Sequence, residues 1–181
     1  MSENRVDPTV AGLFLVGLIT LFFGLLGVLL WNDIALGSMG QQLLVYIGGV
    51  LTAFALVFVL FTFLAAKVGN AFATALFAFV AIALYSVNAG LGAQSMIAFL
   101  IVGVFFIIFA LVAFLIGAPK LLAILLVLTA LIYIFVGLFV NADKVADMET
   151  MALLFGVFGI LAGAVGTYMA VALSTEKLPV F

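Results

Sequence analysis

Residues that could do chemistry are few in this chain. It has no cysteine and no histidine, which excludes disulfide bonds, thiolate or imidazole metal sites, and catalysis by a Cys–His or Ser–His pair. Three acidic residues, Asp143, Asp147 and Glu149, gather in one short segment that is typical of a solvated surface. No segment assembles a nucleophile, a base and an acid, and no basic cluster suggests nucleic-acid binding. We therefore expect neither an enzyme nor a bound cofactor or metal.

The polar groups inside the long apolar runs are uncharged. These runs have no Asp, Glu, Lys or Arg in their interiors; their hydroxyls are Thr20, Thr52, Thr62, Thr74, Thr129, Tyr133, Thr167 and Tyr168. A threonine hydroxyl can bond a carbonyl of its own helix, which is one explanation for such residues. Charged groups near the bilayer centre cost about 2.5 to 3.5 kcal/mol each, and proton pumps accept that cost. A solute pathway through this chain would have an apolar constriction, which favours a small or weakly charged solute over a metal ion.

The elements that must position these residues are membrane helices. The chain is 70% hydrophobic and 7% charged, with a mean hydropathy of +1.61, whereas a soluble domain has about 25% charged residues. A membrane helix needs about 20 apolar residues. Six runs meet or approach that length, at 10–31, 43–66, 71–87, 96–116, 121–140 and 151–173. The sequence thus predicts an all-α integral membrane protein, with residues 1–181 forming a single six-helix domain whose third helix is short.

Basic residues predict the orientation of this domain in the membrane. Arg5, Lys67, Lys120 and Lys177 lie in the N-terminal segment, the second and fourth loops and the C-terminal tail. With six spans, these four segments share one side of the membrane. Only Lys144 lies on the other side. Cytoplasmic segments carry the excess of Lys and Arg, so we expect both termini in the cytoplasm and the protein in the cell membrane.

Small residues follow helical spacing in the last and first runs. Gly156, Gly159, Gly163 and Gly166 form one stripe of the last run, and a second stripe in the first run holds Gly17, Gly24 and Gly27. Such stripes let helix backbones approach closely in a membrane. Two interpretations remain open: tight packing within the chain, or a subunit interface or pore border.

Two predicted helices begin with capping residues. Asp7 and Pro8 precede the first apolar run, and Asn70 precedes the third. Asp and Asn are preferred N-cap residues and proline is common at the first helical position, so capping explains this pattern without a ligand. Helix N-termini also attract anions, which would suit an anionic solute.

Three ordered motifs resemble one family of permeases. The stretch DPTVAGL (7–13) resembles an Asn-Pro-Ala-Pro-Leu-Gly-Leu motif, sharing its first proline, its glycine and its last leucine. KVGNAF (67–72) matches Lys-x-Gly-Asn-x-Phe, and GAVGTYMAVALSTEKLPV (163–180) resembles a Gly-Ala-x-x-x-Tyr-x-Ala run with a Leu-Pro tail. With six spans over the same length, the chain resembles a divergent member of the acetate uptake transporter family, the succinate–acetate permeases.

The resemblance implies a site and an assembly. It places an apolar constriction at Val16, Val80 and Leu128, where the first two are aliphatic here and aromatic in well-known members. The substrate pathway that it implies includes Asp7, Pro8, Asn70, Thr74 and Thr129. It also implies a ring-forming homohexamer with one pathway in each protomer. The family's Ser-Tyr-Gly stretch in the third span, and its Gln and Glu late in the second, are absent.

Three functions follow as alternatives. The first is a permease or channel for acetate or a similar small monocarboxylate, with proton symport as one coupling. The second is a passive channel for a neutral solute such as urea or acetic acid. The third is a membrane scaffold subunit that transports nothing. In the first two, the partners are a small solute and the lipid bilayer.

Overall fold

The computed structural model describes residues 8–31, 38–88, 96–142, 145–175 and 179, and this part of the chain is helical with no strands. Its helices are α1 (Pro8–Trp31), α2 (Ser38–Lys67), α3 (Ala71–Asn88), α4 (Met96–Leu115), α5 (Lys120–Val140) and α6 (Val145–Thr175). The predicted all-helical fold is confirmed. Each helix covers one of the six apolar runs, but α2 begins at Ser38 rather than 43 and α6 begins at Val145 rather than 151.

Five of these helices are long and apolar enough to cross a membrane, whereas the apolar part of α3, 71–86, is shorter. Large apolar side chains cover the outside of the bundle, and Leu115 is 81% exposed. In water such a surface would drive aggregation, whereas lipid solvates it. By length and composition, these are the helices of a multi-pass membrane protein.

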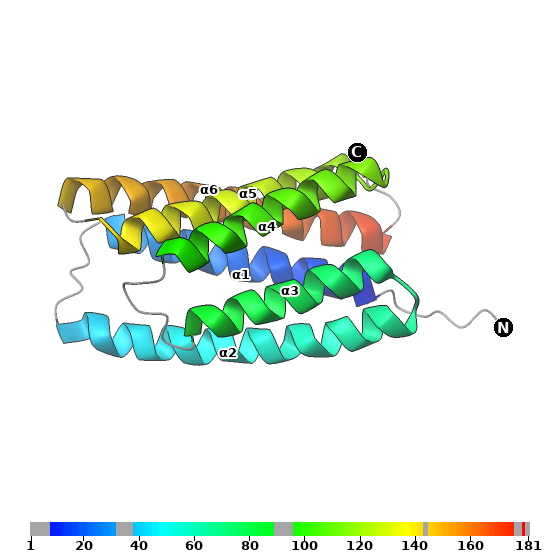
Figure 1. The fold of residues 1–181 in the computed structure, drawn as a ribbon, viewed down its shortest axis with the longest axis horizontal. Helices are drawn as coiled ribbons and strands as arrows, with labels where there is room; N and C mark the ends of the chain where they lie inside the picture. Colours follow the sequence, from blue (N-terminus) through cyan, green and yellow to red (C-terminus); the bar gives the residue numbers. More distant parts are fainter. Residues whose placement is uncertain (1–7, 32–37, 89–95, 143–144, 176–178, 180–181) are drawn as a thin grey trace.

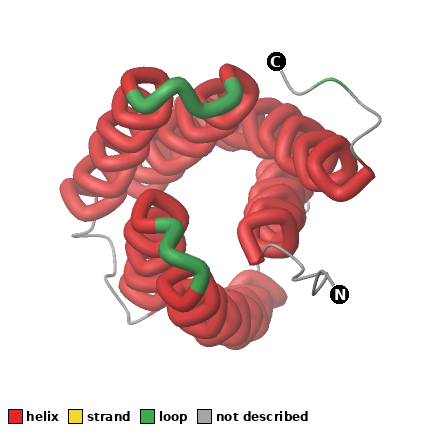
Figure 2. Tube along the Cα trace, turned by 90° about the vertical axis from the view of Figure 1, so that its right-hand side faces the viewer, coloured by secondary structure: helices red, strands yellow, loops and turns green. Residues whose placement is uncertain are grey.

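The helices form a closed ring, seen end-on in Figure 2. α1 packs along α6, α6 on α5, α5 on α4, and α2 on α3 and α1. Aromatic contacts join α3 to α4, including Phe79 with Phe106 at 5.2 Å and Phe72 with Phe109 at 6.0 Å between ring centroids. The inner faces of the helices therefore surround a common interior.

The closest helix contact is between α1 and α6, where glycine faces glycine. A Cβ added at Gly17 would lie 2.8 Å from the backbone nitrogen of Thr167, and one added at Gly27 would lie 2.6 Å from the Cα of Gly156. Gly24 lies against Gly159 in the same way. No side chain fits at these positions, so the two glycine stripes serve packing within the chain.

Two turns lie at the same end of the bundle as the start of α1 and the end of α6, on the right of Figure 1. The α2–α3 turn contains Gly69 at φ +76°, and the α4–α5 turn contains Gly117 at φ +71°. In each turn the glycine N–H bonds a carbonyl three residues back, and the next N–H bonds one five residues back. This helix ending needs a left-handed residue, which glycine supplies without strain. We call this end of the bundle the turn end.

Candidate solute pathway

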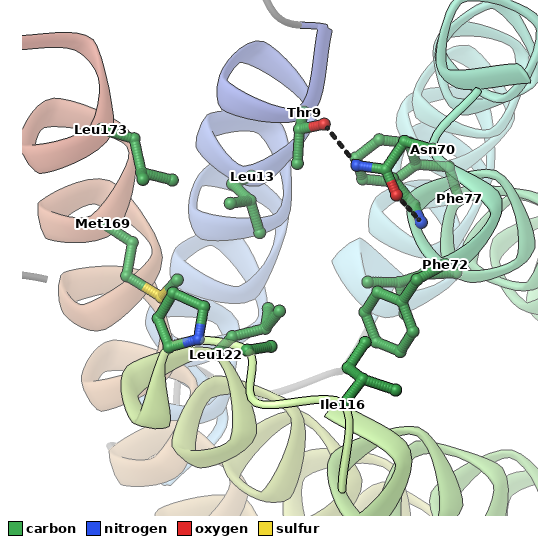
Figure 3. A pocket seen from close by; sticks show the side chains of 13 residues that line it. Thr9, Leu13, Asn70, Phe72, Phe77, Ile116, Leu122, Met169 and Leu173 are labelled. Atoms are coloured by element: carbon green, nitrogen blue, oxygen red, sulfur yellow. Dashed lines mark hydrogen bonds between the residues drawn. The ribbon is translucent and has the colours of Figure 1, made fainter. Parts of the chain in front are cut away.

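An interior cavity with a volume of about 260 Å³ lies at the turn end. We call it the turn-end cavity (Figure 3). Its walls come from α1, α3, the α4–α5 turn, α5 and α6, and none of the described residues that line it is charged. The lining residues are Thr9, Leu13, Asn70, Phe72, Ala73, Leu76, Phe77, Ile116, Ala118, Pro119, Leu122, Met169 and Leu173.

Asn70 forms several hydrogen bonds at the edge of the turn-end cavity, two of which Figure 3 shows. Its Nδ2 donates to Thr9 Oγ1 at 3.3 Å, and its Oδ1 accepts the backbone N–H of Ala73 at 3.0 Å. Its backbone carbonyl accepts the Thr74 hydroxyl at 2.8 Å. Asn70 therefore caps the N-terminus of α3 and ties that terminus to the first turn of α1, as the capping interpretation predicted.

Replacing Asn70 should separate its two roles. Asn70→Ala removes the cap and the link to Thr9, and we expect it to lower the free energy of unfolding by about 1 kcal/mol. Asn70→Asp keeps an oxygen for the Ala73 N–H but loses the donor to Thr9, so we expect it to retain most of that stability. Thermal melting of the purified protein in detergent measures both. Equal melting temperatures for Asn70→Ala and wild type would contradict this role.

A second cavity of about 20 Å³ lies halfway along the helices, inside the ring. We call it the mid-ring cavity. Space of this size holds about one water molecule, so the interior is closed here to any larger solute. The lining residues are Val16, Ile19, Thr20, Phe23, Val80, Leu84, Phe106, Thr129, Ile132 and Tyr133.

The two cavities follow one another along the same three helices. On α1, Thr9 and Leu13 line the turn-end cavity, and Val16 and Thr20 line the mid-ring cavity. Spacings of three and four residues keep these side chains on one face of the helix. α3 and α5 likewise contribute to both cavities. The inner faces of α1, α3 and α5 thus form a continuous lining from the turn end to the middle of the ring.

The structure brings together two of the three residues that the resemblance placed at the constriction. Val16 is 5% exposed and Val80 is 4% exposed, and both line the mid-ring cavity. Leu128 does not: it is half-buried in an apolar groove of about 330 Å³ between α4 and α5. Thr129 lines the mid-ring cavity instead. Successive residues of a helix point about 100° apart, so a shift of one residue in the motif alignment separates the predicted Leu128 from the Thr129 that lines the mid-ring cavity.

The other predicted pathway residues lie in different surroundings. Pro8 is buried in the first turn of α1, and Thr74 is half-buried with its hydroxyl bonded to Asn70. Neither is among the residues that line the two cavities. Asp7 lies outside the described residues. Of the predicted set, Asn70 and Thr129 do line the interior.

Three of the residues that line the mid-ring cavity carry hydroxyl groups. Thr20 Oγ1 donates toward Val16 O at 2.8 Å and Gly17 O at 3.0 Å. Thr129 Oγ1 donates to Leu125 O at 2.8 Å. The third is Tyr133, whose ring stacks on Phe106 with centroids 5.4 Å apart. The sequence indicates all three as mid-span hydroxyls, and the family resemblance places only Thr129 in the pathway. A pattern of hydroxyl residues does not show which face of a helix points inward.

Comparisons with protein-family models, with curated proteins and with solved structures find no match to this chain. The resemblance to the acetate permeases therefore stays a prediction.

Proposed function

We propose that this membrane protein is a permease or channel for acetate or a similar small monocarboxylate. The observation that carries the proposal is that the inner faces of α1, α3 and α5 line both a cavity of about 260 Å³ and, further along the same helices, a closed cavity of about 20 Å³. The three sequence motifs support the same function. In this proposal the solute crosses inside the ring of one chain.

The two cavities suit different steps of such transport. The turn-end cavity has room for a small acid, and it lies at the N-terminus of α3, where backbone N–H groups favour negative charge. The mid-ring cavity is almost wholly apolar and closed, so passage requires its side chains to move apart. A closed apolar constriction of this kind excludes hydrated ions. Lys67 and Lys120 flank the turn end, so by the distribution of basic residues we place the turn-end cavity on the cytoplasmic side of the cell membrane.

A passive channel for a neutral solute is the second candidate. It is favoured by the lining of both cavities, in which no described residue is charged. A scaffold subunit is the third candidate, supported by the small volume of the mid-ring cavity. For a transporting protein we further propose a ring-forming homohexamer, on the family resemblance alone.

Uptake into proteoliposomes tests the proposal. We expect labelled acetate to enter faster than into empty vesicles, and an inward proton gradient to raise the rate if protons are coupled. Unlabelled acetate should compete more strongly than urea or succinate. If folded, reconstituted protein gives the same rate as empty vesicles with and without the gradient, the permease is ruled out and the scaffold is favoured. Vesicle shrinkage against urea in a stopped-flow instrument distinguishes the neutral-solute channel from the acetate permease, because only the channel should let urea cross.

A further inference from the structure

We infer that the mid-ring cavity passes the undissociated acid and not the carboxylate, and that the Tyr133 hydroxyl is the hydrogen-bond donor that selects it. This inference rests on the proposed function and names the chemical form of its substrate. It follows from the donors and acceptors that the three hydroxyl-bearing residues of the lining carry.

The two threonines offer acceptors only. A hydroxyl has one proton to donate and two lone pairs to accept with. Thr20 directs its proton toward Val16 O and Gly17 O, and Thr129 directs its proton to Leu125 O. These short bonds within one helix turn leave each threonine only its oxygen lone pairs for a further hydrogen bond. Both threonines are almost fully covered, so a solute would reach these oxygens only when the lining side chains move apart.

Tyr133 supplies the missing donor. Its side chain is 5% exposed, and within the described part of the chain no hydrogen bond joins its hydroxyl to another residue. Among the same residues, every fully covered side-chain nitrogen or oxygen has a partner. The unbonded Tyr133 oxygen is therefore not fully covered, and Tyr133 is one of the residues that line the mid-ring cavity. Buried tyrosine hydroxyls usually find a partner, so this one indicates a ligand.

One donor and two acceptors match an undissociated carboxylic acid. Its carbonyl oxygen accepts from Tyr133 and its O–H donates to a threonine oxygen. A carboxylate has acceptors only, and each threonine oxygen has already donated its proton, so no hydrogen bond could form between the carboxylate and either threonine. It would also lose its hydration among apolar side chains, since no described residue of the lining is charged, and an unpaired charge in such surroundings is very costly. The proton crosses covalently attached to the acid, so each molecule transported brings one proton and no protein group has to titrate.

Tyr133→Phe tests the donor with little change in shape, because phenylalanine can keep the ring stacked on Phe106. Losing one hydrogen bond of about 1 to 1.5 kcal/mol should lower the initial rate of acetate uptake by about five- to tenfold, after subtraction of empty vesicles. The matched control is Tyr85→Phe, the same chemical change at an exposed position on α3, which should leave the rate at the wild-type value. Equal rates for Tyr133→Phe and wild type would overturn the inference.

Thr129→Val tests an acceptor in the same assay. The control is Thr62→Val on α2, because the Thr62 hydroxyl makes the same bond to the carbonyl four residues earlier, Phe58 O at 2.8 Å, and does not line the mid-ring cavity. We expect the first variant to slow uptake and the second to leave it unchanged. Slow uptake in both would mean that the helix bond matters and the lining oxygen does not.

The pH dependence of wild-type uptake tests the permeating form directly. At a fixed total acetate concentration, the rate should rise as the pH is lowered, in proportion to the undissociated fraction. A rate that follows total acetate at every pH would overturn the inference while leaving the permease intact. Absence of any wild-type uptake above empty vesicles would instead overturn the proposed function, so the two failures are distinguishable.

Discussion

Gly24→Ala is expected to lower the free energy of unfolding by about 3 kcal/mol, the typical upper range for inserting atoms into a fully packed site. The added Cβ would overlap the backbone of Gly159 and Ile160 on α6. Backbone atoms cannot change rotamer, so α1 and α6 would have to separate along their shared face. In lipid, close packing is the main source of attraction between helices, and the loss is therefore large.

The measurement is thermal unfolding in detergent, followed by size-exclusion chromatography of the protein that stays monodisperse. The matched control is Gly49→Ala on α2, where an added Cβ meets nothing within 4 Å. Alanine favours helix over glycine by about 1 kcal/mol, so the control should melt at or slightly above the wild-type temperature. Gly159→Ala introduces the same overlap from the α6 side and should resemble Gly24→Ala. If Gly24→Ala and Gly49→Ala melt alike, the described packing of α1 on α6 is wrong.

The sequence predicts the helices of this protein well, and the reason is physical. A membrane helix needs an uninterrupted apolar run, and polar or charged residues mark where each run stops. The errors are at the starts of α2 and α6, where the structure continues the helix into polar residues such as Ser38 and Asp147. Helices extend beyond the apolar layer because the headgroup region tolerates polar side chains, and hydropathy alone does not detect that extension.

The packing of α1 on α6 also has a signal in the sequence. Gly17, Gly24 and Gly27 on α1 have the same spacing as Gly166, Gly159 and Gly156 read backwards along α6. Antiparallel helices with matching spacing can pair every glycine at once, and the structure pairs these three. Each stripe alone indicates only that some close contact exists.

The inner lining is harder to predict. In a soluble bundle the polar face of a helix shows which side points outward, because water and core differ. Here lipid and core are both apolar, so α5 is apolar around its whole circumference and its sequence does not show which side faces inward. Leu128 was therefore predicted without a signal for its side of α5, and it is the neighbouring Thr129 that lines the mid-ring cavity. The sequence indicates Tyr133 only as one of eight mid-span hydroxyls, because its position against Phe23 and Phe106 depends on tertiary packing.

Val80→Phe is expected to reduce acetate uptake to the level of empty vesicles. The mid-ring cavity of about 20 Å³ cannot hold a phenyl ring beside its present lining, so the ring would fill the cavity and hold the lining helices in contact. Overpacking of this kind costs about 1 to 3 kcal/mol, which lowers stability without necessarily unfolding the chain. Monodispersity in detergent identifies the folded fraction, and uptake is then compared per folded protein.

Leu128→Phe is the matched control for the loss of uptake expected in Val80→Phe. Leu128 lies in the groove of about 330 Å³ between α4 and α5, which has room for a larger side chain, so its uptake should remain near wild type. The pair also decides between the register that the sequence alignment predicted and the one that the structure shows. Uptake lost in Leu128→Phe and kept in Val80→Phe would move the solute route from the interior of the ring to the outer groove. Uptake lost in Val80→Phe alone would place the solute route inside the ring, along the faces of α1, α3 and α5 that line the two cavities.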